Sequence, residues 1–235
     1  MANDRTRIWA SVIPAATLPL IASVFYFVLF AENPFARYVY AITKLFTIVW
    51  PLITIHFILR TGWPRIAWDT KHELKAVPMG AAFGVAVVAL MFVALQTSIG
   101  DMVDRNAGRI GGIVKNFGIH ETYWLFAAFI SFIHSFIEEY YWRWFLYGRL
   151  AKVVPNAFAH MLAGAAFAAH HVVVASVYFG LGWGFALGAC VAIGGIVWSL
   201  LYEKQGTLTG AWVSHMIVDA GLMAIGHRLI FGSYL

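Results

Sequence analysis

Long apolar runs separated by short polar stretches dominate the chain. About 20 helical residues cross a hydrocarbon layer that is about 30 Å thick, so a run of this length is typical of a membrane-spanning helix. Seven runs qualify, and they cover residues 8–30, 38–59, 77–98, 123–150, 157–179, 182–201 and 208–226. The pattern predicts an all-α polytopic transmembrane helix bundle of about seven spans, within a range of six to eight.

The first run is too long for the apolar core of a secretory signal peptide, which has about 7 to 15 residues. Pro14 and Pro19 interrupt it, and a membrane helix tolerates prolines when neighbouring groups satisfy the freed carbonyls. The longest polar stretches, 61–75 and 101–121, have the size of loops. We therefore expect a retained first span and a single transmembrane domain over residues 1–235.

Composition also indicates a membrane protein. Only 11% of the residues are charged and 61% are hydrophobic, whereas soluble domains average about 25% charged residues. The 16 Lys and Arg against 11 Asp and Glu give a net charge of +5, which we attribute to cytoplasmic loops and not to nucleic-acid binding. Cys190 is the single cysteine of the sequence, so an internal disulfide and a Cys-rich metal cage are excluded.

Basic residues are unevenly divided between the two sides of the predicted bundle. Because cytoplasmic loops are enriched in Lys and Arg, the more basic side is expected to face the cytoplasm. With the N-terminus inside, the cytoplasmic side has Arg5, Arg7, Arg60, Arg65, Lys71, Lys75, Arg149, Lys152 and Lys204, and the opposite side has Arg37, Arg105, Arg109 and Lys115. We expect a cytoplasmic N-terminus and, for so compact a chain without disulfides, the plasma membrane of a prokaryote.

A small residue recurs at every fourth position from just before the sixth run into its first half. These residues are Gly180, Gly184, Gly188 and Ala192. A ridge of this kind lets two membrane helices approach backbone to backbone, so it predicts tight helix packing.

Ionisable side chains within the spans are the main unusual feature of the sequence. Each costs about 2.5 to 3.5 kcal/mol at the membrane centre, so each needs a physical reason. Lys44 and His56 lie near the ends of the second run, where we expect them to reach the interface. Three other spans carry larger sets: His134, Glu138, Glu139 and Arg143 in span four, His170 and His171 in span five, and His215 and Asp219 in span seven.

Depth and helical phase single out one acid among these residues. At a rise of about 1.5 Å per residue, Glu138, His171 and His215 each lie within about 5 Å of the midplane of their span. Glu139 and Arg143 have the i,i+4 spacing of a helical ion pair, whereas Glu138 is rotated about 100° away and has no such partner. A carboxyl buried without a countercharge suits general-base catalysis. We therefore expect an active site in the membrane between spans four, five and seven.

Three short motifs occur in order in these spans. EExxxR runs from Glu138 to Arg143, FxxxH from Phe167 to His171, and HxxxN/D from His215 to Asp219. Together they resemble the CPBP family of membrane-embedded CAAX proteases and bacteriocin-processing enzymes, also called the ABI family. The motif-bearing catalytic half covers about residues 121–227.

The resemblance implies a glutamate-dependent intramembrane endopeptidase without a metal or other cofactor. Glu138 would be the general base that activates water, His171 would share that water, and His215 would stabilise the oxyanion. Peptide hydrolysis needs a base, a donor where negative charge develops and a proton for the leaving amine, and one Glu with two His supplies all three.

Other residues would support this site. The resemblance makes Glu139 and Arg143 a structural pair that holds their helix and its neighbours. It makes Phe167 a packing residue that orients the helix of the FxxxH motif. His134 lies one turn before Glu138 on the same face, where it serves either as a supporting contact to the site or in helix packing.

Two positions need separate treatment. Asp219 stands where the best-known members of the family have Asn, and a carboxylate cannot donate to an oxyanion. We expect Asp219 to accept from an imidazole N–H of His215 and to orient that ring. His170 points about 100° away from His171; the FxxxH spacing selects His171, and we expect His170 to bond a backbone carbonyl or to face a loop.

Two other classes of function stay open at this point. Glu138, His171 and His215 also match a catalytic zinc set of two His and one carboxylate, although the chain lacks HExxH. A non-enzymatic membrane scaffold, bacteriocin-immunity factor or proton-coupled transporter would use buried acids and histidines to relay protons. For a peptidase, we expect a membrane-associated, lipidated or hydrophobic protein or peptide as substrate. Prenylated C-termini, bacteriocin-like peptides and C-terminal sorting signals fit equally, and the oligomeric state is open.

Overall fold

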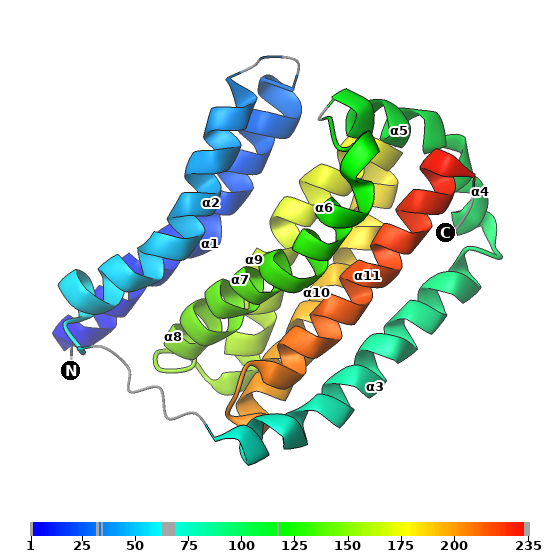
Figure 1. The fold of residues 1–235 in the computed structure, drawn as a ribbon. Helices are drawn as coiled ribbons and strands as arrows, with labels where there is room; N and C mark the ends of the chain where they lie inside the picture. The colour runs from blue at the N-terminus through cyan, green and yellow to red at the C-terminus, as the bar shows by residue number, and fades with distance from the viewer. Residues whose placement is uncertain (1, 32, 34, 63–68, 117, 233–235) are drawn as a thin grey trace. The chain divides into compact units, whose positions relative to one another are not determined.

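A computed structural model of the chain describes residues 2–31, 33, 35–62, 69–116 and 118–232 (Figure 1). These residues form helices and turns and no strand, which confirms the predicted all-α class. They divide into two compact units. The first unit is Met1–Asp69 with Ile137–Leu208, and the second is Thr70–Phe136 with Thr209–Leu235. The assignment of one domain to residues 1–235 stays a prediction.

The first unit contains both N-terminal helices and the central part of the motif-bearing half. Its helices are α1 (Ala2–Val24), π-helical η1 (Phe25–Leu29), α2 (Ala36–Ile53), π-helical η2 (Thr54–Leu59), the end of α7 (Ser135–Glu139), π-helical η5 (Tyr140–Tyr147), α8 (Gly148–Leu150), α9 (Asn156–Phe179) and α10 (Leu181–Gln205). Buried polar tips join the helices: the Tyr141 hydroxyl donates to the Ala15 carbonyl at 2.8 Å, and Trp50 Nε1 donates to the Ser11 carbonyl at 2.9 Å.

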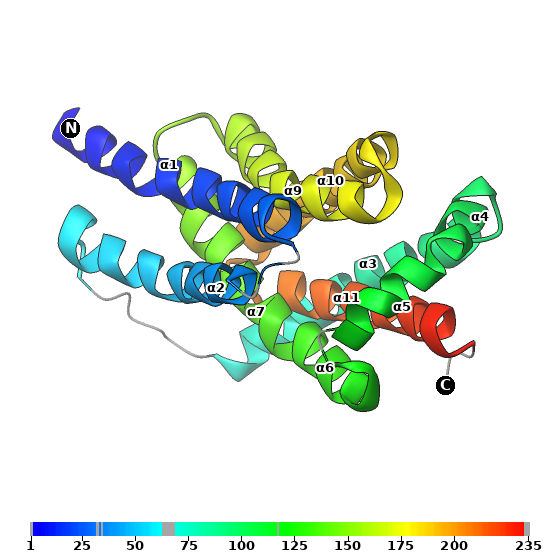
Figure 2. The ribbon, with the colours of Figure 1, turned by 90° about the horizontal axis from the view of Figure 1, so that it is seen from above.

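Helices α9 and α10 pack closely along the predicted small-residue ridge, and they lie side by side in Figures 1 and 2. A Cβ added at Gly184 would overlap Ser176, and one added at Gly188 would overlap Val172, each at less than 3.0 Å. The ridge therefore packs against α9, as predicted. Gly180 separates the two helices with a φ of +85°, a conformation that favours glycine.

The second unit consists of one helix from the middle of the chain, several short helices and the last helix. These are α3 (Thr70–Ala94), α4 (Ser98–Arg105), α5 (Ala107–Asn116), the 3-10 helix η3 (His120–Thr122), α6 (Tyr123–Phe129), π-helical η4 (Ile130–His134), the start of α7 and α11 (Thr209–Phe231). The polar stretch 101–121 was predicted to be a loop, and the structure corrects this: most of it is helical. The Thr97 hydroxyl caps α4 by accepting from the Ile99 amide at 3.3 Å.

Helix α11 is held against α3 by glycines. A Cβ at Gly80 would overlap the backbone of Gly210, and a Cβ at Gly84 would lie 2.9 Å from the Ser214 carbonyl oxygen. The backbones are in direct contact at these positions, so neither glycine accepts a side chain without separating the helices. The Trp212 indole of α11 also donates a hydrogen bond to the Phe132 carbonyl of η4 at 3.1 Å.

Among the described residues, five helices are long and apolar enough to cross a membrane. They are Asp4–Leu29, Ala36–Leu59, Thr70–Ala94, Asn156–Phe179 and Leu181–Gln205, so the chain is an integral membrane protein. The predicted spans 123–150 and 208–226 are also helical over most of their length, but their polar motif residues lower their hydropathy. The number of seven spans and the cytoplasmic N-terminus stay predictions, and Arg65, used for the orientation, lies outside the described residues.

Candidate active site

The two glutamates of the EExxxR motif end α7, and π-helical η5 follows directly. Such wide turns are frequent at functional sites in helices. Glu139 and Arg143 are buried, with 0% and 1% exposure, and Arg143 Nη1 lies 3.1 Å from Glu139 Oε1. The i,i+4 pair expected from the spacing is thus present in the interior of the first unit.

The Arg143 guanidinium is enclosed by aromatic rings of two other helices. Its Cζ lies 4.5 Å from the ring centroid of Phe167 on α9 and 4.9 Å from that of Trp198 on α10. A cation over the face of an aromatic ring is attracted by the ring quadrupole, most strongly where water is excluded. Arg143 therefore connects η5 to α9 and α10, and Phe167, 2% exposed, packs against it.

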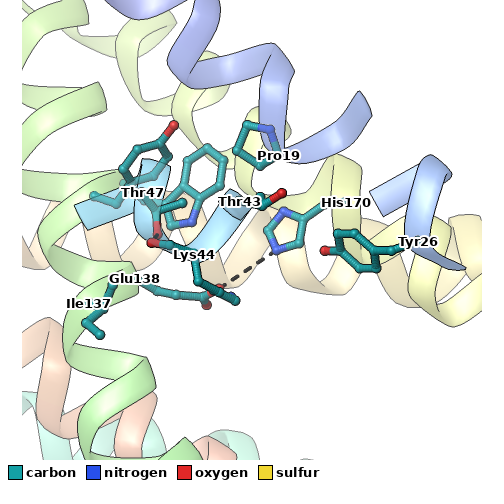
Figure 3. Close-up of a pocket in the computed structure, with 10 residues that line it drawn as sticks. Pro19, Tyr26, Thr43, Lys44, Thr47, Ile137, Glu138 and His170 are labelled. Atoms are coloured by element: carbon teal, nitrogen blue, oxygen red, sulfur yellow. Dashed lines mark hydrogen bonds and ion pairs between the residues drawn. The ribbon is translucent and has the colours of Figure 1, made fainter. Parts of the chain in front are cut away.

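Glu138 lines a small cavity in the same unit (Figure 3). The space open to the centre of a water molecule is about 20 Å³, which is enough for one water. Ten residues from α1, η1, α2, α7, η5 and α9 line it: Pro19, Tyr26, Thr43, Lys44, Thr47, Ile137, Glu138, Tyr141, Trp142 and His170. Glu138 is 7% exposed, so its carboxylate lies at a confined space lined by both polar and apolar side chains.

Two basic side chains approach the same oxygen of Glu138. Lys44 Nζ lies 3.8 Å from Oε1, and His170 Nε2 lies 3.9 Å from it. The expectation that Glu138 lacks a countercharge was therefore wrong, because it considered partners on its own helix only. Lys44, expected to reach the membrane interface, instead comes from α2 to the rim of the cavity.

His170 and His171 have different surroundings. The His170 ring stacks on Trp142, with centroids 5.6 Å apart and planes 9° from parallel, and it faces the cavity. His171 Nδ1 donates to the Phe167 carbonyl at 2.9 Å, which makes Nε2 the acceptor nitrogen of the neutral ring. His171 is outside the ten residues that line the cavity. The structure thus brings His170, which the motif spacing did not select, within 3.9 Å of Glu138.

The third motif lies in the second unit, on α11. His215 and Asp219 are buried, with 4% and 9% exposure, and His215 Nε2 lies 3.6 Å from Asp219 Oδ2. This is the i,i+4 proximity that the sequence predicts. His134 ends η4 and is half-buried.

A comparison with protein families agrees with these motifs. The family model described as Type II CAAX prenyl endopeptidase Rce1-like matches residues 120–221. The match covers less than half of the chain and supports the resemblance to the CPBP family of CAAX proteases. The matched segment contains all three CPBP motifs, and the match indicates a membrane protease. Neither a curated protein nor a solved structure gives a significant match to the chain.

Proposed function

We propose that the chain is an intramembrane endopeptidase in which Glu138 activates water to hydrolyse a peptide bond. The observation that carries the proposal is a buried carboxylate at a cavity of water size, with two basic groups within 4 Å of one of its oxygens. A base in this position takes the proton of a water whose oxygen attacks the scissile carbonyl carbon. No metal or other cofactor is needed for this step.

The remaining steps complete the hydrolysis. The carbonyl oxygen becomes an oxyanion, and we assign its stabilisation to His215, because a protonated imidazole donates where negative charge develops. Asp219 orients that ring. The proton taken by Glu138 passes to the amide nitrogen as the C–N bond breaks, which yields one new carboxylate and one new amine. His171 by its motif, or His170 by its position, shares the attacking water with Glu138.

The wall of the cavity supports an apolar or lipidated substrate. Trp142, Tyr141, Ile137 and Pro19 line the cavity together with the polar groups, and the matched family is described by a prenylated CAAX substrate. We propose a membrane-associated peptide with an apolar or lipid-modified segment as the substrate class. Cleavage of a farnesylated CAAX peptide, its unmodified form and an apolar transmembrane peptide tests this class, and exclusive cleavage of an unmodified soluble peptide would contradict it.

Replacement of the base tests the activity itself. Glu138→Gln keeps the shape of the side chain but cannot accept the proton, so we expect loss of cleavage by a factor of about 10² to 10⁴. Membrane peptides and secreted fragments are compared by quantitative mass spectrometry in cells with the wild type and the variant. Glu121→Gln, at a side chain that is 93% exposed, is the matched control. Unchanged cleavage by a folded Glu138→Gln protein would refute the glutamate mechanism.

A further inference from the structure

Lys44 is the cationic residue of the cavity that no family motif includes. It lies on α2, outside the matched segment 120–221, and its Nζ is 3.8 Å from Glu138 Oε1. Its side chain is 31% exposed, whereas that of Glu138 is 9% exposed. The contact joins the first half of the chain to the predicted base, and both residues belong to the first unit.

Neighbouring groups place the Lys44 ammonium at this rim. Nζ lies 5.5 Å from the ring centroid of Tyr40, one turn earlier on α2, and aromatic faces attract cations. Thr43 and Thr47 lie on the same stretch of the cavity wall, but each hydroxyl donates to a carbonyl of its own helix, at 2.7 and 2.8 Å. Lys44 is therefore the group of α2 that contributes positive charge to the cavity.

Lys44 and His170 differ in the charge that they ordinarily carry at neutral pH. At neutral pH a lysine is ordinarily cationic, whereas a histidine is ordinarily uncharged and able to accept or donate a hydrogen bond. Glu138 works as a base only when it is ionised, and a cation within about 4 to 6 Å favours the ionised form of a buried carboxyl. With the charge supplied by Lys44, the His170 ring can interact with water in its neutral form.

We propose that Lys44 is a positioning residue for catalysis: its ammonium keeps Glu138 ionised and directed into the cavity. The proposal rests on the function proposed above, because it requires Glu138 to be the base. It also assigns a part of the reaction to α2, whose sequence lies outside the family match.

Kinetics of purified variants test the proposal with the substrate that the wild type cleaves. Lys44→Met is expected to lower kcat about tenfold or more while KM changes less than about twofold, because the base and not substrate binding is impaired. Lys44→Arg keeps the charge and is expected to recover most of the lost kcat. Lys75→Met, at an exposed lysine of α3, is the matched control. A Lys44→Met protein with wild-type kcat overturns the proposal, as does an Arg variant no better than Met.

Two further comparisons distinguish a failure of the Lys44 proposal from a failure of the glutamate mechanism. If Glu138→Gln is inactive and Lys44→Met is fully active, Lys44 has no positioning role while the glutamate mechanism stands. If Glu138→Gln is fully active, the glutamate mechanism itself fails. Thermal unfolding of the two single variants and of Lys44→Met/Glu138→Gln in detergent needs no substrate. We expect the double variant to regain stability relative to Lys44→Met, since no uncompensated carboxylate is left; equal instability would contradict the charge pairing.

Discussion

Replacing Glu139 with glutamine leaves the Arg143 guanidinium in the interior without its negative partner. Both side chains are almost fully buried, and their closest nitrogen and oxygen are 3.1 Å apart. Removing one member of a buried pair typically costs about 3 to 5 kcal/mol, because an uncompensated charge remains in a medium of low polarity. Since about 1.4 kcal/mol corresponds to a factor of ten, the ratio of folded to unfolded protein should fall by about 10² to 10⁴.

The free energy of unfolding in a mixed-detergent titration, followed by tryptophan fluorescence and circular dichroism, measures this cost. Trp198 is a local reporter, because its ring lies 4.9 Å from the guanidinium carbon. Asp104→Asn is the matched control: it disrupts the Arg228–Asp104 pair, whose side chains are 29% and 57% exposed. Exposed pairs contribute at most about 1 kcal/mol.

A loss of less than about 1 kcal/mol for Glu139→Gln would refute the view that this pair is a buried structural element. The double variant Glu139→Leu/Arg143→Met gives a second check. Replacing a whole buried pair by apolar side chains is often neutral, so the double variant should be more stable than Glu139→Gln. The adjacent Glu138→Gln should instead remove activity with little loss of stability, which separates the two glutamates of the motif.

Three other outcomes follow from the structure. Between His170→Gln and His171→Gln, the larger loss of kcat should occur for the histidine that shares the attacking water. If both variants keep the wild-type kcat, neither histidine has that role. Gly80→Ala should destabilise the protein by about 1 to 3 kcal/mol or more, because its Cβ would overlap the backbone of Gly210. A Cβ at Gly111 meets nothing within 4 Å, so Gly111→Ala should be tolerated. Equal melting temperatures of the two variants would contradict the close contact of α3 and α11. Peptide cleavage should persist after dialysis against a zinc chelator, and loss of cleavage that added zinc restores would favour the zinc alternative.

Local rules explain what the sequence could predict about the site. The spacing of Glu139 and Arg143 sets their proximity because positions four apart share a face of a helix, and the same rule brings His215 to Asp219. The glycine ridge of α10 was predictable for a similar reason, since small side chains at a helical period leave one face of the helix open to a neighbour. In each case the contact depends on one helix and on the period of its turns.

These local rules could not predict contacts between helices that are distant in the sequence. Lys44 meets Glu138 only because α2 packs beside α7 and η5, and nothing in the phase of either helix determines that neighbour. The choice between His170 and His171 depends in the same way on how α9 is turned toward the cavity. The π-helical segments lie inside long apolar runs, where hydropathy cannot distinguish a π-turn from an α-turn. The short helices α4 and α5 leave no long apolar run, so hydropathy alone predicted a loop in their place.

The two units alternate along the polypeptide, which passes from one to the other after Asp69, Phe136 and Leu208. The order of synthesis therefore differs from the order of assembly. Helices α1 and α2 enter the membrane long before α9 and α10, the helices that complete their unit, have left the ribosome. Such non-local contacts form slowly and leave polar groups uncovered in the meantime. His215 is on α11, which is synthesised after α7, so a nascent chain would hold the proposed general base in the bilayer before it had the group proposed to stabilise the oxyanion.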